Sequence, residues 1–146
     1  MILFLKFKYP VFLDLDKKTL ESLVKRLQFA LFKPFDFVAE KGKVCSAMIM
    51  FVEGKVEARD ENQSIGAHVA HQVLKRRNQS ELANDVIKTF DAGSSFGEQI
   101  FGMQPKDELL FPYYLQCVQR CIALTLTRKD YAEVLYFQRT NEEAEN

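Results

Sequence analysis

The chain has 146 residues, the usual length of one domain and enough to bury about two-thirds of its unfolded surface around a single core. Apolar residues make up 47% and charged residues 27%, a balance that excludes a disordered or collagen-like chain. The 20 basic and 20 acidic residues cancel, and the pI is near 6.7. Binding to nucleic acid or to an acidic membrane through bulk charge is therefore not expected.

The cysteines and the apolar start of the chain bear on its compartment. Cys45, Cys117 and Cys121 form an odd set without a CxxC pair, which favours a reducing, cytoplasmic setting over a disulfide-stapled secreted module. Residues 1–5 are apolar like a signal peptide, but Lys6 interrupts them too early. No apolar run is long enough to span a bilayer. We expect a cytoplasmic domain, on the cytosolic face if it serves a membrane protein, without direct membrane insertion.

The first 34 residues are predicted to form an N-terminal helical or entry segment. Leucines recur at helical spacing over residues 16–31 and polar residues fill the other face, which predicts an amphipathic helix. Asp16 suits the N-cap, and the Lys33-Pro34 pair ends the pattern. Residues 5–10 alternate like an edge strand, although a short helix fits them equally well.

Strand patterns dominate residues 35–127. Residues 47–52 are a continuous apolar run, which is typical of a strand buried on both faces. Glu53-Gly54 is predicted to turn the chain, and residues 55–59 then alternate as an adjacent antiparallel strand.

The second half of this region is less regular. Residues 60–85 are polar and predict a long excursion between strands. Residues 86–90 resume as a strand, and residues 98–101 fit one short helical turn. Two further strands are predicted, at 113–118 and 121–127.

The C-terminal element carries a clear helix signal. Thr127 can cap a helix over residues 128–140, and residues 141–146 form an acidic tail that we expect to be frayed. The whole chain, residues 1–146, is thus predicted to be a single α+β domain: an antiparallel jelly-roll-like β-roll with flanking N- and C-terminal helices.

The strongest local signal for a ligand site is the segment FGEQI at 96–100. A glycine turn that leads into a short helix exposes backbone N–H groups that can hold a phosphate. Glu98 would repel a free phosphate, but its carboxylate can accept hydrogen bonds from a ribose hydroxyl. The pattern favours a sugar phosphate, although taken alone such a turn is usually a plain loop.

The order of motifs resembles the cyclic nucleotide-binding domain family over nearly the whole chain. The resemblance rests on five segments: YPVFLDL (9–15), FVAEKG (37–42), MIMFVEGKV (48–56), GSSFGE (93–98) and the last strand with its following helix (124–135). It implies that Glu98 meets the ribose 2′-hydroxyl of cAMP or cGMP, and that the backbone of Gly97, Gln99 and Ile100 surrounds the cyclic phosphate.

The chain departs from the family pattern where the family has a phosphate-clamping arginine. No arginine stands between Glu98 and Arg120, and Phe111-Pro112-Tyr113-Tyr114 falls at the expected position. Lys106 is the only cation in the preceding loop, and an ammonium group lacks the planar fork that grips a phosphate in two places. We therefore expect weak or absent nucleotide binding. The candidate ligand-binding residues are Gly97, Glu98, Gln99, Ile100, Lys106, Phe111 and Tyr113.

Three functions from different classes follow. The resemblance favours a non-catalytic regulatory domain, a fragment of a larger signalling or membrane-transport protein such as an ion channel or exchanger, whose partners are the other domains of that protein. The alternative is a ligand-independent scaffold or interaction domain with a self-filled pocket, in which Tyr136 or Phe137 could be the filling side chain. The third function is a metal-dependent jelly-roll enzyme, which would need several histidines in the roll. We expect no enzyme activity, no catalytic residue, no cofactor and no metal.

Three residues of the polar excursion have a default interpretation as solvated surface. His68 and His71 stand three apart without a carboxylate or cysteine at ligand spacing. Ser80 follows a basic run that loosely resembles a kinase site, and such matches are common by chance.

Overall fold

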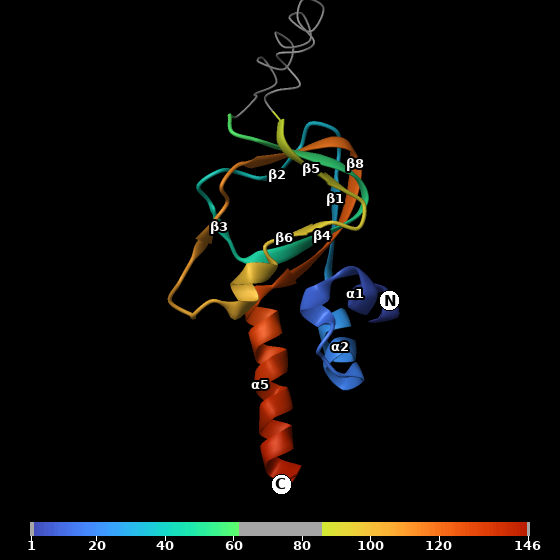
Figure 1. Ribbon diagram of the computed structural model, residues 1–146, viewed down its shortest axis with the longest axis vertical. Helices are drawn as coiled ribbons and strands as arrows, with labels where there is room; N and C mark the ends of the chain where they lie inside the picture. The colour runs from blue at the N-terminus through green and yellow to red at the C-terminus, as the bar shows by residue number, and fades with distance from the viewer. Residues whose placement is uncertain (1, 62–85, 146) are drawn as a thin grey trace, which may run out of the picture.

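The computed structural model describes residues 2–61 and 86–145. Helical elements stand at both ends of this chain, and strands fill the middle (Figure 1). The elements in order are α1 (Ile2–Lys8), the 3-10 helix η1 (Pro10–Phe12), α2 (Lys17–Val24), β1 (Gln28–Phe32), β2 (Phe37–Ala39), β3 (Val44–Cys45), β4 (Ala47–Arg59), β5 (Val86–Asp91), β6 (Ser95–Phe96), the 3-10 helix η2 (Glu98–Gly102), β7 (Leu109–Leu110), β8 (Tyr114–Thr127) and α5 (Arg128–Glu145).

The strands pair antiparallel throughout and curl into a roll. The main sheet has the order β1-β8-β4-β5, with β2 added to β8 and β6 added to β4, and β3 pairs with β7 in a small second sheet. In Figure 1 the roll lies above α1 and α2, and α5 runs away from it beside them. This arrangement confirms the predicted α+β class, with a β-roll between N- and C-terminal helices.

Strand β4 explains why the core has two parts. Ile49 and Phe51 point into the roll, and Met48 and Met50 face the helices, so all four are at most 7% exposed. Because neighbouring residues of a strand face opposite sides, a continuous apolar run is what a strand between two cores requires. The predicted burial of both faces is confirmed.

Gly54 lies inside this strand, and the predicted turn at Glu53-Gly54 is wrong. Gly54 has a φ of +96°, and an added Cβ would lie 2.3 Å from the carbonyl oxygen of Arg120 on β8. The pairing with β8 shifts register on both sides of this glycine. A glycine at positive φ here makes a β-bulge that bends the strand without reversing it. A second correction concerns the partner strand: the two strands predicted at 113–118 and 121–127 are the single strand β8.

The helix predicted over residues 16–31 is wrong in its second half. Asp16 does cap α2, accepting a hydrogen bond from the Thr19 amide at 2.9 Å, but the helix ends at Val24. The chain then forms β1, whose residues pair with β8 from Gln28 opposite Thr125 onward. Helical spacing of leucines is a local signal, and here it loses to backbone hydrogen bonds with a strand almost 100 residues away. The roll therefore begins before residue 35.

The two ends of the chain are helical. Of the two alternatives for residues 5–10, the helix is confirmed, because α1 runs to Lys8. Helix α5 begins at the predicted cap, where the Thr127 hydroxyl oxygen accepts from the Asp130 amide at 3.0 Å, and it continues to Glu145. The helix thus extends beyond its predicted end at residue 140, and the fraying of residues 141–146 stays a prediction.

An ion-pair cluster joins α5 to α2. The Arg26 guanidinium, just after α2, donates to the carboxylates of Asp130 at 3.0 Å and Glu133 at 2.5 Å. The side-chain amide of Gln138 donates to Asp16 at 3.0 Å, one turn further along. These contacts fix the acidic side of α5 against the N-terminal helices.

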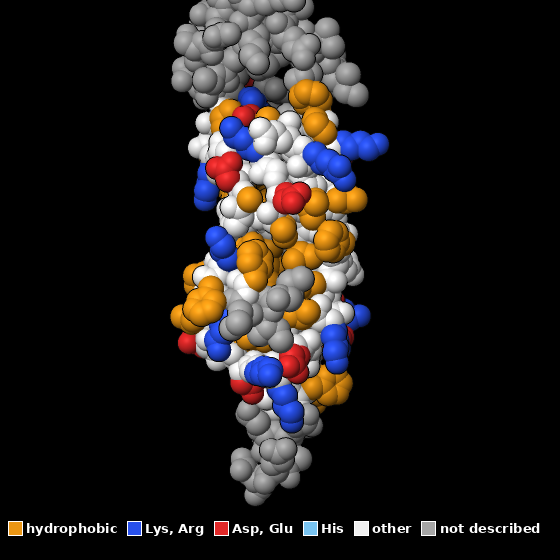
Figure 2. Space-filling view, turned by 90° about the vertical axis from the view of Figure 1, so that its right-hand side faces the viewer, with side chains coloured by type: hydrophobic (Ala, Val, Ile, Leu, Met, Phe, Trp, Pro, Cys, Tyr) orange, Lys and Arg blue, Asp and Glu red, His pale blue; other side chains and the backbone are white. Residues whose placement is uncertain are grey.

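Figure 2 shows a gathering of hydrophobic side chains at mid-height on one face of the molecule. Large apolar side chains of α1 and β1 are exposed, among them Phe7 at 80%, Phe29 at 72% and Leu31 at 62%. No helix in the described part of the chain is both long and apolar enough to cross a bilayer.

Candidate functional site

The predicted phosphate cradle lies where β6 leaves the sheet. Ser95 and Phe96 pair with β4, opposite Met50 and Ile49, and Gly97 then takes a φ of +96° before η2 begins at Glu98. The left-handed conformation turns the chain sharply out of the sheet, which only glycine does without strain. The sequence-predicted turn and short helix are thus both present.

Gly97 also packs too closely for a side chain. An added Cβ would lie 2.8 Å from the Ala47 carbonyl oxygen and 3.0 Å from Cys45 Sγ. The Cys45 thiol donates to that same carbonyl at 3.2 Å, and burial raises the pKa of the thiol. The floor of the turn is therefore closed by the neighbouring β3–β4 corner, with a protonated thiol against it.

The polar groups of the turn are partly used within the turn itself. The Ser95 hydroxyl donates to a Glu98 carboxylate oxygen at 3.3 Å, and the Ile100 amide donates to the Gly97 carbonyl at 3.2 Å. The Ile100 side chain is buried in the roll core, and Gln99 is exposed. Of the backbone groups expected around a phosphate, the Ile100 amide thus already has an acceptor.

Aromatic rings occupy the inside of the roll next to this turn. Phe111 is 9% exposed and stacks on Phe96, with centroids 5.4 Å apart and an interplanar angle of 23°. Tyr113 packs against Phe96 at 5.8 Å and against Phe90 at 6.4 Å. Phe90 in turn contacts Phe51 at 5.5 Å. At the position of the missing arginine, Phe111 is therefore part of the hydrophobic core and Tyr113 packs against it.

Lys106 lies apart from this cluster, exposed in the loop between η2 and β7. The cation that organises this loop is Arg128, the first residue of α5. Its guanidinium donates to the carbonyl oxygens of Asp107 at 2.6 Å, Met103 at 3.2 Å and Gln104. Sequence reasoning missed this arginine, since its partners are backbone carbonyls that no side-chain pattern reveals.

Among the described residues, the remaining candidates give no second site. Cys117 and Cys121 are buried, consistent with packing, and burial raises the pKa of Cys121 to about 11. Across residues 2–61 and 86–145, no group of His, Cys, Asp and Glu side chains is placed to hold a metal. His68, His71, Ser80 and the excursion that contains them lie outside the described residues, apart from its first two positions.

No protein-family model matches this sequence, and no curated protein matches it. Several solved structures are similar to it. A cyclic nucleotide-binding-like protein from Brucella abortus aligns with a TM-score of 0.67 at 11% identity, over 92% of this chain and 97% of that one. The sensor domain of the transcriptional regulator DNR from Pseudomonas aeruginosa aligns at 0.64 and 13%, over 93% and 80%.

A third similar structure is the cyclic-nucleotide binding homology domain of a KCNH channel, at a TM-score of 0.62 and 15% identity, over 92% of this chain and 82% of that one. Identities this low carry information on the fold and not on the ligand. The three alignments each cover 92–93% of this chain. The chain therefore has the fold of the cyclic nucleotide-binding-like domains.

Proposed function

We propose that this chain is a non-catalytic regulatory domain that binds cAMP and cGMP weakly or not at all. It belongs, in this proposal, to a larger signalling or membrane-transport protein and docks on the other domains of that protein at the cytosolic side. The similar structures support the regulatory role, because they include the sensor domain of a transcriptional regulator and a domain of a channel. An ion channel or exchanger is the finer version of the proposal.

The observation that carries the proposal is the stacked pair Phe96–Phe111 inside the roll. A nucleotide seated against Glu98 needs room beside the glycine turn, and Phe111 has to leave its buried position to provide it. The chain also lacks an arginine between Glu98 and Arg120. A hydrogen bond to a charged group is worth roughly 1.5–3 kcal/mol, so losing the clamp alone costs about one to two decades of affinity.

Isothermal titration with cAMP and with cGMP tests the proposal. We expect a dissociation constant weaker than about 100 µM for both nucleotides, and no difference between the natural chain and Glu98→Gln. Glu98→Gln is the matched control, because it keeps the size of the side chain and removes its charge. Low-micromolar binding that Glu98→Gln weakens would overturn the proposal.

A ligand-independent scaffold is the second candidate, and the aromatic filling of the roll favours it. The version in which Tyr136 or Phe137 fills the pocket is wrong, since these side chains are 68% and 59% exposed on α5. Phe111 and its ring neighbours would take that role instead. Hydrogen exchange of α5 tests the weakly binding version of the regulatory domain against the scaffold: protection that changes at millimolar nucleotide supports weak binding and excludes a ligand-independent scaffold.

The exposed apolar side chains of α1 and β1 support docking on a neighbouring domain. Phe7, Phe29 and Leu31 are 80%, 72% and 62% exposed, and a gathering of exposed apolar side chains is typical of an interaction surface. The absence of enzyme activity and of a bound cofactor stays a prediction.

A further inference from the structure

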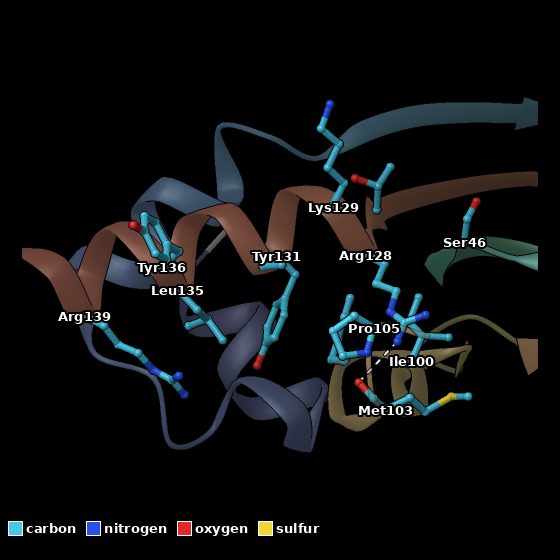
Figure 3. Close-up of a pocket in the computed structure, with 13 residues that line it drawn as sticks. Ser46, Ile100, Met103, Pro105, Arg128, Lys129, Tyr131, Leu135, Tyr136 and Arg139 are labelled. Atoms are coloured by element: carbon cyan, nitrogen blue, oxygen red, sulfur yellow. Dashed lines mark hydrogen bonds between the residues drawn. The ribbon is translucent and has the colours of Figure 1, made fainter. Parts of the chain in front are cut away.

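A groove of about 790 Å³ lies outside the roll, between α5 and the loop that follows η2. Its volume is in the range of small-molecule sites. Apolar side chains from both sides line it, among them Ile100, Met103, Pro105 and Leu135. Figure 3 shows Met103 and Pro105 beside η2 on one side of the groove and Leu135 on α5 on the other.

One face of α5 supplies the other wall. Tyr131, Leu135 and Arg139 point to the same side of the helix in Figure 3, as residues four apart must. The Tyr131 ring stacks on Phe101, with centroids 4.0 Å apart and an angle of 15°. Burial raises the pKa of Tyr131, so its hydroxyl stays protonated at neutral pH. The groove thus has the Phe101–Tyr131 stack in its wall and the Arg139 guanidinium at the end toward the C-terminus of α5.

The charges of α5 are sorted between its two sides. The carboxylates of Asp130 and Glu133 face away from the groove and pair with Arg26. The described residues that line the groove include Arg128, Lys129 and Arg139, and neither Asp nor Glu is among them.

Only one of these three cations is placed to meet a ligand. The Arg128 guanidinium is occupied by the loop carbonyls. The Lys129 ammonium points away from the groove in Figure 3, whereas the Arg139 guanidinium lies on the groove side next to Leu135. A planar guanidinium pairs with a carboxylate through two parallel hydrogen bonds.

We propose that this groove binds a free long-chain carboxylate, with the apolar chain along Leu135 and the Phe101–Tyr131 stack and the carboxylate on Arg139. Among the described residues that line the groove, the walls are mainly apolar and Arg139 is the one cation placed to meet a ligand, which matches the charge pattern of a long-chain carboxylate. This site is separate from the interior of the roll, so it does not depend on nucleotide binding.

Isothermal titration of the full chain with decanoate, dodecanoate and decanol, all below their aggregation concentrations, tests the proposal. Buried apolar area grows with chain length, so we expect dodecanoate to bind about tenfold more tightly than decanoate. The charged hydrogen bonds should make decanoate at least about fivefold tighter than decanol. Amide chemical shifts should change at 101–103 and 131–139.

Two arginine variants make the test specific. Arg139→Gln should weaken the binding of decanoate to the level of decanol and leave the affinity for decanol unchanged. Arg120→Gln, at an exposed arginine on β8, should leave both unchanged. Leu135→Gln should weaken the carboxylate and the alcohol together.

Several results would overturn the proposal. These are equal affinities for decanoate and decanol, an unchanged affinity of Arg139→Gln for decanoate, or amide shift changes confined to β1. Dimerisation of the chain in sedimentation, with amide shift changes on dimerisation at 101–103 and 131–139, would also overturn it. So would binding to phosphatidylglycerol vesicles without binding of monomeric decanoate.

Discussion

Phe111→Ala measures whether the roll interior is a filled core. Phe111 is 9% exposed and belongs to the cluster inside the roll, where it stacks on Phe96. Truncating a buried phenylalanine to alanine costs about 3–5 kcal/mol through lost burial and the cavity left behind. Because Phe111 retains a small exposed edge, we expect the lower end, about 3 kcal/mol. The lost ring pair accounts for about 0.5–1.5 kcal/mol of this.

Urea unfolding followed by circular dichroism gives the free energy of unfolding of each variant. A loss of about 3 kcal/mol is a large share of the roughly 5–15 kcal/mol that domains of this kind have, so the midpoint should move clearly at an unchanged slope. Phe29→Ala is the matched control, because Phe29 is 72% exposed and its removal should cost less than about 0.5 kcal/mol. Equal effects of the two variants would refute a roll filled by Phe111.

Three further changes test the backbone, the last helix and a buried thiol. Gly54→Ala should lower the free energy of unfolding by more than about 2 kcal/mol, since the added Cβ meets the Arg120 carbonyl oxygen at 2.3 Å. Gly42→Ala, at a φ of +86° with open space around it, should lower it by only about 1 kcal/mol. Equal losses in urea unfolding would exclude the clash. Thr127→Ala should remove the cap of α5 and about 1 kcal/mol of stability, whereas Thr127→Ser keeps the hydroxyl and should lose little; a similar loss in both would contradict a capping role. Burial raises the pKa of Cys121 from 9.0 to about 11, so the folded chain holds this proton more tightly between those values and the free energy of unfolding should fall as pH rises through them. Urea unfolding across that pH range should show a shallower fall for Cys121→Ala, and an unchanged slope would argue against the shift.

Local chemistry made several elements predictable from the sequence. The caps at Asp16 and Thr127 are short-range hydrogen bonds, and such signals depend on a few neighbouring residues. The run at 47–52 predicted a strand between two cores, because only burial on both faces tolerates an uninterrupted apolar run. The glycine turn into η2 followed from the residue types alone. Together these fixed the fold class and the place of the candidate site.

The content of that site needed the tertiary structure. The sequence showed that an arginine is missing beside Glu98, and it left open whether the space is empty or filled. The packing of Phe111 on Phe96 shows that the space is filled. This contact depends on how β6 and the residue after β7 meet in the roll.

What the sequence determined by itself is a set of local preferences: where helices can begin, which strand is buried on both faces, and where the glycine turn before η2 lies. Only the tertiary structure decided that β1 leaves its helical pattern to pair with β8, that Gly54 bulges instead of reversing the strand, and that Arg128 holds the η2 loop by its carbonyls. In each case the deciding partner is a backbone group far away in the sequence. Backbone groups are the same in every residue, so their pairing leaves no mark in the amino-acid pattern.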